Sequence, residues 1–173
     1  MDEIKLQPLL FEQRDDFIRR NQQAFMKAAV ETFGPQEKEV ISREDILRSL
    51  DDPKEETFRI LLNGQVVGGV SLFIDRETQY NSLDLLFLDP EIHSQNIGFR
   101  VWNMIETMYP ETKVWETHTP YFETRNIHFY VNKCGFQIDE FWCEYFKPSE
   151  PMPDEMPVDE GPDEMFHFVK VMK

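Results

Sequence analysis

Gln95, Gly98 and Arg100 have the spacing of an anion-binding turn at the start of a helix. They follow an apolar segment that ends at Asp89-Pro90 and precede a helical pattern of apolar residues. The first turn of a helix has N–H groups without intrahelical partners and the positive end of the helix dipole, so it can bind phosphate without a lysine. Glycine lets the main chain approach a phosphate oxygen because it has no Cβ. The alternative is a structural turn that binds nothing.

Asn126 and Tyr130 form a second candidate pair, about 30 residues further along the chain. They are four residues apart, so on a helix they share one face. A tyrosine hydroxyl can act as a general acid if it is positioned beside a leaving group. The alternative is that Tyr130 is a core aromatic residue with a hydrogen-bonded hydroxyl. The neighbouring Phe129, Cys134 and Phe136 are interpreted as core residues.

The hydrophobic pattern predicts the elements that must position these residues. We expect strands at 3–9, 57–62, 65–75, 80–88, 113–119, 136–146 and 165–172, and helices at 15–33, 97–108 and 125–134. Ser42 followed by Asp45 is the capping pattern of a further helix that runs through about Leu50, and Asn63-Gly64 predicts a hairpin turn between the second and third strands. An antiparallel meander is thus followed by a β-α-β-α-β segment, which predicts an α/β fold with one mixed sheet and helices on both faces. We expect a single domain over residues 1–173, with an acidic, proline-rich loop at 148–164 before the last strand.

Two segments resemble the motifs of a known family. LFLDPEIHSQNIG is similar to motif A of the GNAT N-acetyltransferases, a strand followed by Gln/Arg-x-x-Gly-x-Gly/Ala and a helix. RNIHFYVNKCGF resembles motif B of the same family, and the order of elements agrees over nearly the whole chain. One position departs from the family, because Arg100 stands where Gly or Ala is usual. A side chain of this size either turns away from the phosphates or adds a cation to them.

The resemblance implies that acetyl-CoA is the cosubstrate and that an acetyl group moves to a primary amine by direct attack in a ternary complex. The resemblance also assigns residues to the coenzyme. Main-chain groups around the pyrophosphate would come from Gln95, Asn96, Ile97, Gly98, Phe99 and Arg100. Main chain at Phe87 and Leu88 would pair with the pantetheine arm, and Asn126 would lie near its amides. Tyr130 would protonate the departing thiolate, since the pKa values of a phenol and a thiol are comparable.

A protonated amine cannot attack a carbonyl carbon, so a base or a chain of water molecules must remove a proton. Asp84 lies eleven residues before Gln95, the spacing at which family members that use a carboxylate base have a glutamate. Aspartate is one methylene shorter, which suggests an intervening water. The alternative is an exposed aspartate on a strand. Glu116 and His118 are the other candidates, because strand alternation puts them on one face.

The family resemblance places the acceptor beside the early helices and the connection before the last strand. In this chain those are Phe25, Phe33 and the acidic 148–164 loop. An aromatic wall with carboxylates nearby suits a cationic amine such as a polyamine, an amino sugar or a lysine side chain.

The overall charge restricts the classes of partner. The formal net charge is −15, from 18 basic and 33 acidic residues, and it repels nucleic acid and anionic lipid. No apolar run approaches the roughly 18 residues of a membrane span, and the N-terminus does not resemble a secretory signal. Cys134 and Cys143 have no metal-ligand spacing, so no metal is expected. We expect a cytoplasmic protein that can form a homodimer.

Two other functions are consistent with parts of the pattern. A non-catalytic acyl-CoA sensor or interaction domain would keep the phosphate-binding turn and lose the chemistry. Asn126 and Tyr130 argue against this alternative, whereas Arg100 and the unsettled base favour it. A nucleotide-binding module would need a glycine-rich loop with Lys-Ser/Thr, which the sequence lacks.

Overall fold

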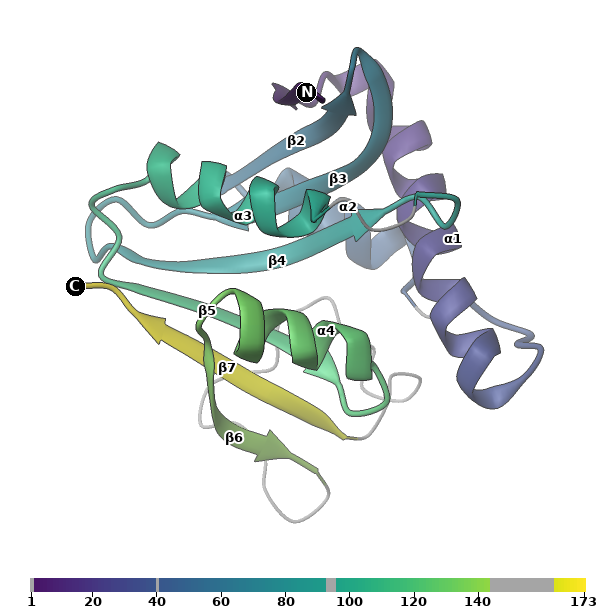
Figure 1. Cartoon of the computed structure of the whole chain (residues 1–173). Helices are drawn as coiled ribbons and strands as arrows, with labels where there is room; N and C mark the ends of the chain where they lie inside the picture. The colour runs from purple at the N-terminus through teal and green to yellow at the C-terminus, as the bar shows by residue number, and fades with distance from the viewer. Residues whose placement is uncertain (1, 40, 93–95, 144–163) are drawn as a thin grey trace.

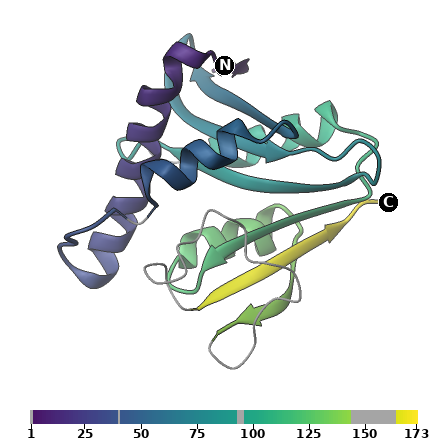
Figure 2. The same ribbon diagram turned by 180° about the vertical axis from the view of Figure 1, so that it is seen from behind.

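The computed structural model describes residues 2–39, 41–92, 96–143 and 164–173 (Figures 1 and 2). Among these residues, seven strands form one sheet in the order β1-β2-β3-β4-β5-β7-β6. The strands are β1 (Ile4–Pro8), β2 (Glu55–Leu62), β3 (Gln65–Phe73), β4 (Tyr80–Leu88), β5 (Val114–Pro120), β6 (Gln137–Trp142) and β7 (Met165–Val171). The helical elements are η1 (Phe11–Gln13), α1 (Arg14–Phe33), α2 (Arg43–Asp51), α3 (Ile97–Met108), α4 (Thr124–His128) and η2 (Phe129–Lys133). The prediction of an α/β fold with a mixed sheet is confirmed.

The first four strands form an antiparallel meander, as the sequence predicts. The turn between β2 and β3 is made by Asn63 and Gly64, with φ values of 51° and 85°. Two positive φ values in a two-residue turn match the right-handed twist of the strands, which explains why Asn-Gly is favoured there. Helix α2 begins after Ser42, whose Oγ accepts a hydrogen bond from the Asp45 N–H at 3.1 Å. This is the predicted N-cap.

The parallel pairing of β4 with β5 is short, and this feature shapes the site. It covers only Tyr80–Ser82 and Val114–Glu116. At the next position, the Thr117 hydroxyl donates to the Leu83 carbonyl at 2.8 Å. Beyond that point the two strands diverge, as Figure 1 shows. The gap between the second half of β4 and the end of β5 is called the wedge below.

Helices cover both faces of the sheet. Helices α1 and α2 pack on one face, where Phe17 contacts Phe87 edge to face with ring centroids 5.1 Å apart (Figure 2). Helix α3 and the α4–η2 segment cover the other face, where Trp102 of α3 contacts Trp115 of β5 at 5.2 Å. The larger core lies on this second face, and α1, α3 and the α4–η2 segment all contribute residues to the wedge.

Two consecutive glycines in β3 allow close packing at the wedge. A Cβ on Gly68 would lie 2.1 Å from the carbonyl oxygen of Phe87, and a Cβ on Gly69 would lie 2.3 Å from the Phe17 ring. Neither distance is compatible with a side chain. The glycines therefore let β4 and α1 approach β3 more closely than any other residue type would permit.

The structure differs from the predicted elements near the C-terminus. The helix predicted over 125–134 begins at Thr124 and changes to a π-helical turn over Phe129–Lys133, in which the Cys134 N–H donates to the Phe129 carbonyl at 3.0 Å. Strand β6 ends at Trp142, earlier than the predicted 146. Apart from Glu164, the acidic loop predicted at 148–164 lies outside the described residues.

Candidate active site

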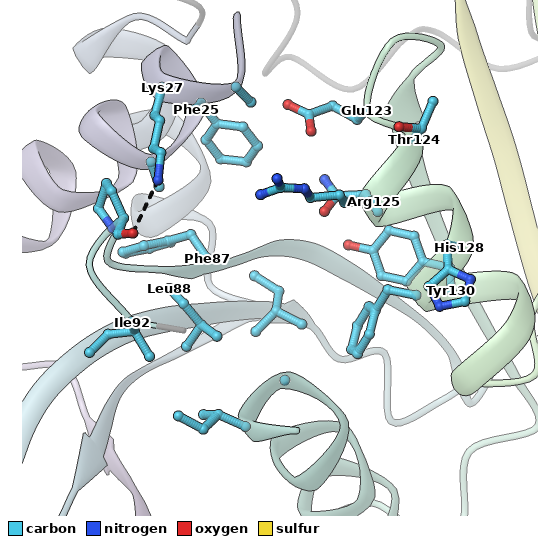
Figure 3. Close-up of a pocket in the computed structure, with 18 of the residues that line it drawn as sticks. Phe25, Lys27, Phe87, Leu88, Ile92, Glu123, Thr124, Arg125, His128 and Tyr130 are labelled. Carbon is cyan, nitrogen blue, oxygen red and sulfur yellow. Dashed lines mark hydrogen bonds between the residues drawn. The ribbon is translucent and has the colours of Figure 1, made fainter. Parts of the chain in front are cut away.

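A cavity of about 470 Å³ occupies the wedge (Figure 3). Its lining comes from elements on both faces of the sheet, so the cavity passes between β4 and the segment after β5. Helix α1 contributes Ala24, Phe25, Lys27, Ala28, Glu31 and Thr32. The end of β4 and the start of α3 contribute residues 86–90, 92 and 96–99, and the α4–η2 side contributes 122–126, 128–130 and 133. Groups on the two faces can therefore reach one ligand or two ligands that meet in the wedge.

The predicted anion-binding turn opens into this cavity. Asn96 has left-handed backbone angles (φ 55°, ψ 30°) and precedes α3. Its carbonyl accepts the N–H of Arg100 at 2.9 Å, which leaves the N–H groups of Ile97, Gly98 and Phe99 as the donors of the first turn. Gln95, which the sequence also assigned to the turn, lies outside the described residues.

Glycine at position 98 also has a packing role. A Cβ there would lie 3.3 Å from two ring carbons of Phe129, which is tighter than ordinary van der Waals contact. The absence of a side chain therefore lets the first turn of α3 lie directly against the α4–η2 wall without displacing Phe129.

Arg100 does not line the cavity, and its guanidinium donates to the carbonyl of Asp2 at 2.7 Å. Of the two alternatives left by the sequence, the structure shows the side chain turned away. A different cation lies at the turn, because the Lys133 ammonium donates to the Asn96 Oδ1 at 2.8 Å and the residue lines the cavity. The two are 37 residues apart, so their proximity could not be predicted from local spacing.

Tyr130 lies on the opposite side of the same cavity. Its side chain is buried, with 6% of the residue exposed, and Figure 3 shows its hydroxyl pointing into the cavity. Burial raises the pKa of Tyr130, and a hydrogen bond with Thr117 only partly offsets this effect. The hydroxyl therefore carries its proton at neutral pH. The residue sits in the π-helical turn of η2, a distortion that is frequent at functional sites.

The remaining coenzyme residues predicted from the sequence also meet here. Phe87 and Leu88, at the end of β4, line the cavity beside the diverging strand edge. Asn126 lines the cavity from α4, and its Nδ2 lies 3.4 Å from the Thr119 hydroxyl. The structure therefore brings together one helix N-terminus, one open strand edge and one buried phenol.

Comparison with known proteins identifies the family. The family model described as the acetyltransferase (GNAT) family matches residues 18–136. The chain belongs to this family. It is 46% identical over 165 residues to the uncharacterized protein YrkN of Bacillus subtilis (strain 168), with 91% of this chain and 88% of that protein covered.

Solved structures of GNAT enzymes share the fold. The ribosomal-protein-S18-alanine N-acetyltransferase of Escherichia coli superposes with a TM-score of 0.69 at 12% identity, covering 100% of this chain and 95% of that chain. A GNAT acetyltransferase from Elizabethkingia anophelis with acetyl-CoA bound gives 0.67 at 16% identity, covering 99% and 100%. A mutant of the spermidine N-acetyltransferase SpeG from Vibrio cholerae gives 0.66 at 13% identity, covering 97% and 93%.

The carboxylate that the sequence favoured as base in this GNAT protein lies away from the cavity lining. Asp84 is the extra residue of a β-bulge in β4, where Ser71 pairs with Leu85 and the next residue of β3 pairs with Leu83. It is hydrogen-bonded to Glu55, and burial raises the pKa of Glu55. The base role of Asp84 stays a prediction.

Glu116 and His118 also lie outside the cavity lining. Glu116 accepts a hydrogen bond from the Ser82 hydroxyl at 3.0 Å and lies 3.2 Å from His167. Both candidates alternate with the buried Trp115 and Thr117, so they face away from Tyr130. Burial lowers the pKa of His118 to about 4.

The two predicted acceptor residues differ in position. Phe25 lines the cavity from α1. Phe33, near the end of the same helix, is 53% exposed and does not line the cavity. Its ring packs edge to face on Phe122, which does, with centroids 4.9 Å apart.

Several charged residues of the site were missed by the sequence analysis. Glu123, Arg125 and Lys133 come from the α4–η2 side, and Lys27 and Glu31 come from α1. Glu123 and Arg125 lie three residues and one residue before Asn126, so their closeness to the second motif was the only available signal. The pairing with α1 depends on tertiary structure.

The described residues contain no group of three or more His, Cys, Asp and Glu side chains arranged to hold a metal ion. No helix in the described ranges has the length and apolar character needed to cross a membrane.

Proposed function

We propose that this GNAT protein is an acetyl-CoA-dependent N-acetyltransferase that acetylates a primary amine by direct attack in a ternary complex. One observation carries the proposal. The N-terminus of α3 and the buried hydroxyl of Tyr130 open into one cavity, which also reaches α1 on the other face of the sheet. Donor and acceptor can thus approach each other from opposite faces and meet in the wedge.

The N–H groups of Ile97, Gly98 and Phe99 would hold the pyrophosphate. The dipole of α3 and the Lys133 ammonium make the potential at this turn positive, although the net charge of the whole chain is −15. The main chain at Phe87 and Leu88 would pair with the pantetheine amides, because the edge of β4 is not covered by β5 there. Asn126 would hydrogen-bond the arm from α4.

Tyr130 would act as general acid. It remains protonated at neutral pH because burial raises its pKa, and it can give that proton to the sulfur as the carbon–sulfur bond breaks. Asp84 is the base expected from the family resemblance, and it would act through water because it does not line the cavity.

The acceptor is proposed to be a cationic amine with an apolar part. Phe25 and Glu31 line the α1 side of the cavity, which offers an aromatic surface and a carboxylate. Two of the structural neighbours act, by their names, on spermidine and on an alanine of a ribosomal protein. Polyamines and peptide amines are therefore the first acceptors to test.

The direct test is release of CoA from acetyl-CoA in the presence of spermidine, glucosamine, a lysine peptide or an alanyl peptide. We expect turnover with at least one of them. Binding of acetyl-CoA, measured by thermal shift, without turnover on any amine would favour the acyl-CoA sensor.

A variant tests where the coenzyme binds. Gly98→Val puts a side chain into the first turn of α3 and against Phe129, so acetyl-CoA binding should be lost while the fold survives. Calorimetry and circular dichroism measure the two properties. Unchanged affinity in a folded Gly98→Val protein would exclude this turn as the pyrophosphate site.

A further inference from the structure

Glu123 is a buried carboxylate without a partner. Only 9% of the residue is exposed, and its side chain makes no hydrogen bond or ion pair with any residue that the structure describes. It occupies the N-cap position of α4 but does not cap the helix through its side chain. Its oxygens are not among the fully buried, unpaired polar atoms of the described residues, so they open to the cavity, where a ligand can supply the missing partner.

The carboxylate points into the proposed active-site cavity. Figure 3 shows Glu123 extending from the start of α4 toward Phe25 on α1. The Tyr130 hydroxyl points into the same cavity, and the Arg125 side chain lies between the two groups in this view. Burial is the largest cause of the raised pKa of Tyr130, and the charge of Glu123 adds a smaller effect in the same direction. Acid and carboxylate therefore face the same space.

The charged groups around Glu123 leave it available as a base. Burial and then the charge of Glu31 on α1 raise the pKa of Glu123, and Arg125 on α4 partly opposes them. Lys27 lies 4.0 Å from Glu31 and donates to the Pro90 carbonyl, so its charge is already engaged. A carboxylate with a raised pKa binds a proton more readily than an exposed one.

We propose that Glu123 binds the ammonium group of the acceptor amine and accepts its proton before attack. This inference rests on the proposed acetyl transfer, and it assigns the role of base to Glu123 in place of Asp84.

Glu123, Tyr130, the amine and solvent are sufficient to account for every proton in the reaction. The ammonium gives one proton to Glu123, and the neutral nitrogen forms a bond to the thioester carbonyl carbon. The carbon–sulfur bond breaks, and the sulfur takes the proton of Tyr130. The second proton on nitrogen returns to the Tyr130 phenolate, and Glu123 releases its proton to solvent. The products are an amide, CoA thiol and one proton.

Glu123→Gln tests the proposal because it keeps the shape and removes the charge. With the acceptor identified from the amine panel, we expect turnover at neutral pH to fall by roughly 10²–10⁴-fold. The loss should shrink at high pH, where the amine is already neutral. The apparent affinity for acetyl-CoA should stay unchanged, because the proposed coenzyme contacts lie elsewhere.

Two variants serve as comparisons. Glu111→Gln makes the same chemical change at an exposed position outside the cavity and should behave as wild type. Asp84→Asn tests the rival carboxylate, because it loses the acid limb of the pH–rate profile if Asp84 is the base. Thermal unfolding of each variant shows whether it is folded.

The outcomes separate this inference from the proposed function. If wild type turns over and Glu123→Gln agrees with it within about threefold, or loses the same factor at every pH, the inference is wrong and acetyl transfer stands. If Asp84→Asn alone loses the acid limb, the base is Asp84. If wild type neither acetylates nor binds any amine of the panel with CoA present, measured by calorimetry, both fail.

Discussion

Tyr130 combines a packing role for its ring with a proposed catalytic role for its hydroxyl. Its ring packs against Phe136 and Phe168 in the core, whereas its hydroxyl faces the cavity. Tyr130→Phe keeps the ring and removes the hydroxyl. A general acid contributes about 10²–10⁴-fold, so turnover should fall by that factor while the KM for acetyl-CoA changes little. Steady-state kinetics on one active amine provides the measurement.

Tyr121→Phe is the matched control for this change, because Tyr121 is 41% exposed and does not line the cavity. An acyl donor whose leaving thiol has a lower pKa should partly restore Tyr130→Phe, since a better leaving group needs less protonation. Agreement of Tyr130→Phe with wild type within about threefold would make Tyr130 a packing residue.

Site residues whose neighbours lie far away in the sequence could not be predicted from the sequence. The placement of Gly98, Asn126 and Tyr130 in one cavity was expected, because short motifs specify how a strand, turn and helix follow one another. Lys133 was missed because its partner Asn96 lies 37 residues away, and Glu123 was missed because α1 lines the other side of the cavity that it faces. The direction of the Arg100 side chain depends on its contact with the distant Asp2.

At the scale of elements, the approach of α1 and β4 to β3 depends on Gly69. A Cβ there would lie 2.3 Å from the Phe17 ring and 2.8 Å from the Phe87 ring. Gly69→Ala must push these rings apart, and overpacking of this kind costs about 1–3 kcal/mol. Chemical denaturation should show that loss in the free energy of unfolding. Because Phe87 lies at the wedge, acetyl-CoA affinity should fall as well.

Gly64→Ala is a useful comparison, because it strains a positive φ without meeting any atom within 4 Å. It should lower stability while leaving acetyl-CoA affinity intact. Equal affinity in Gly69→Ala and wild type would mean that the position of Phe87 does not matter for the coenzyme.

The order of elements was predictable because each has a local signal. The Asn63-Gly64 turn and the Ser42 cap were both predicted and found. The β-bulge at Asp84, the early divergence of β4 from β5 and the π-helical turn at Tyr130 were not predicted. The first two depend on how neighbouring strands pair, and all three irregularities adjoin the wedge.

At the scale of the whole molecule, a cluster of ionisable side chains connects β5, β7 and β6, which are neighbours at one side of the sheet. His167 of β7 lies 3.2 Å from Glu116 of β5 and 2.5 Å from Asp139 of β6. Burial opposes a charge on His167, but its hydrogen bonds with Glu116 and Asp139 outweigh burial and raise its pKa. The hydrogen bond with His167 lowers the pKa of Glu116.

The signs of these shifts define a pH window for stability. The Glu116 contribution is complete above its ordinary pKa of 4.5 and is lost as pH falls through the lowered value. The His167 contribution is complete below 6.5 and is lost as pH rises through the raised value. The difference in unfolding free energy between wild type and His167→Gln should therefore be largest between these pH values. A difference that does not vary with pH would show that packing on Trp142 accounts for the effect.

The central claim is that the wedge brings an acetyl thioester and an amine together for direct transfer. The most direct measurement is mass spectrometry after incubation of the wild-type chain with isotope-labelled acetyl-CoA and the amine panel. We expect the label to appear on the nitrogen of at least one amine, in an amount equal to the CoA released, with no label on the protein. Release of CoA without labelled amine, or a stable acetylated form of the protein on the reaction path, would contradict it.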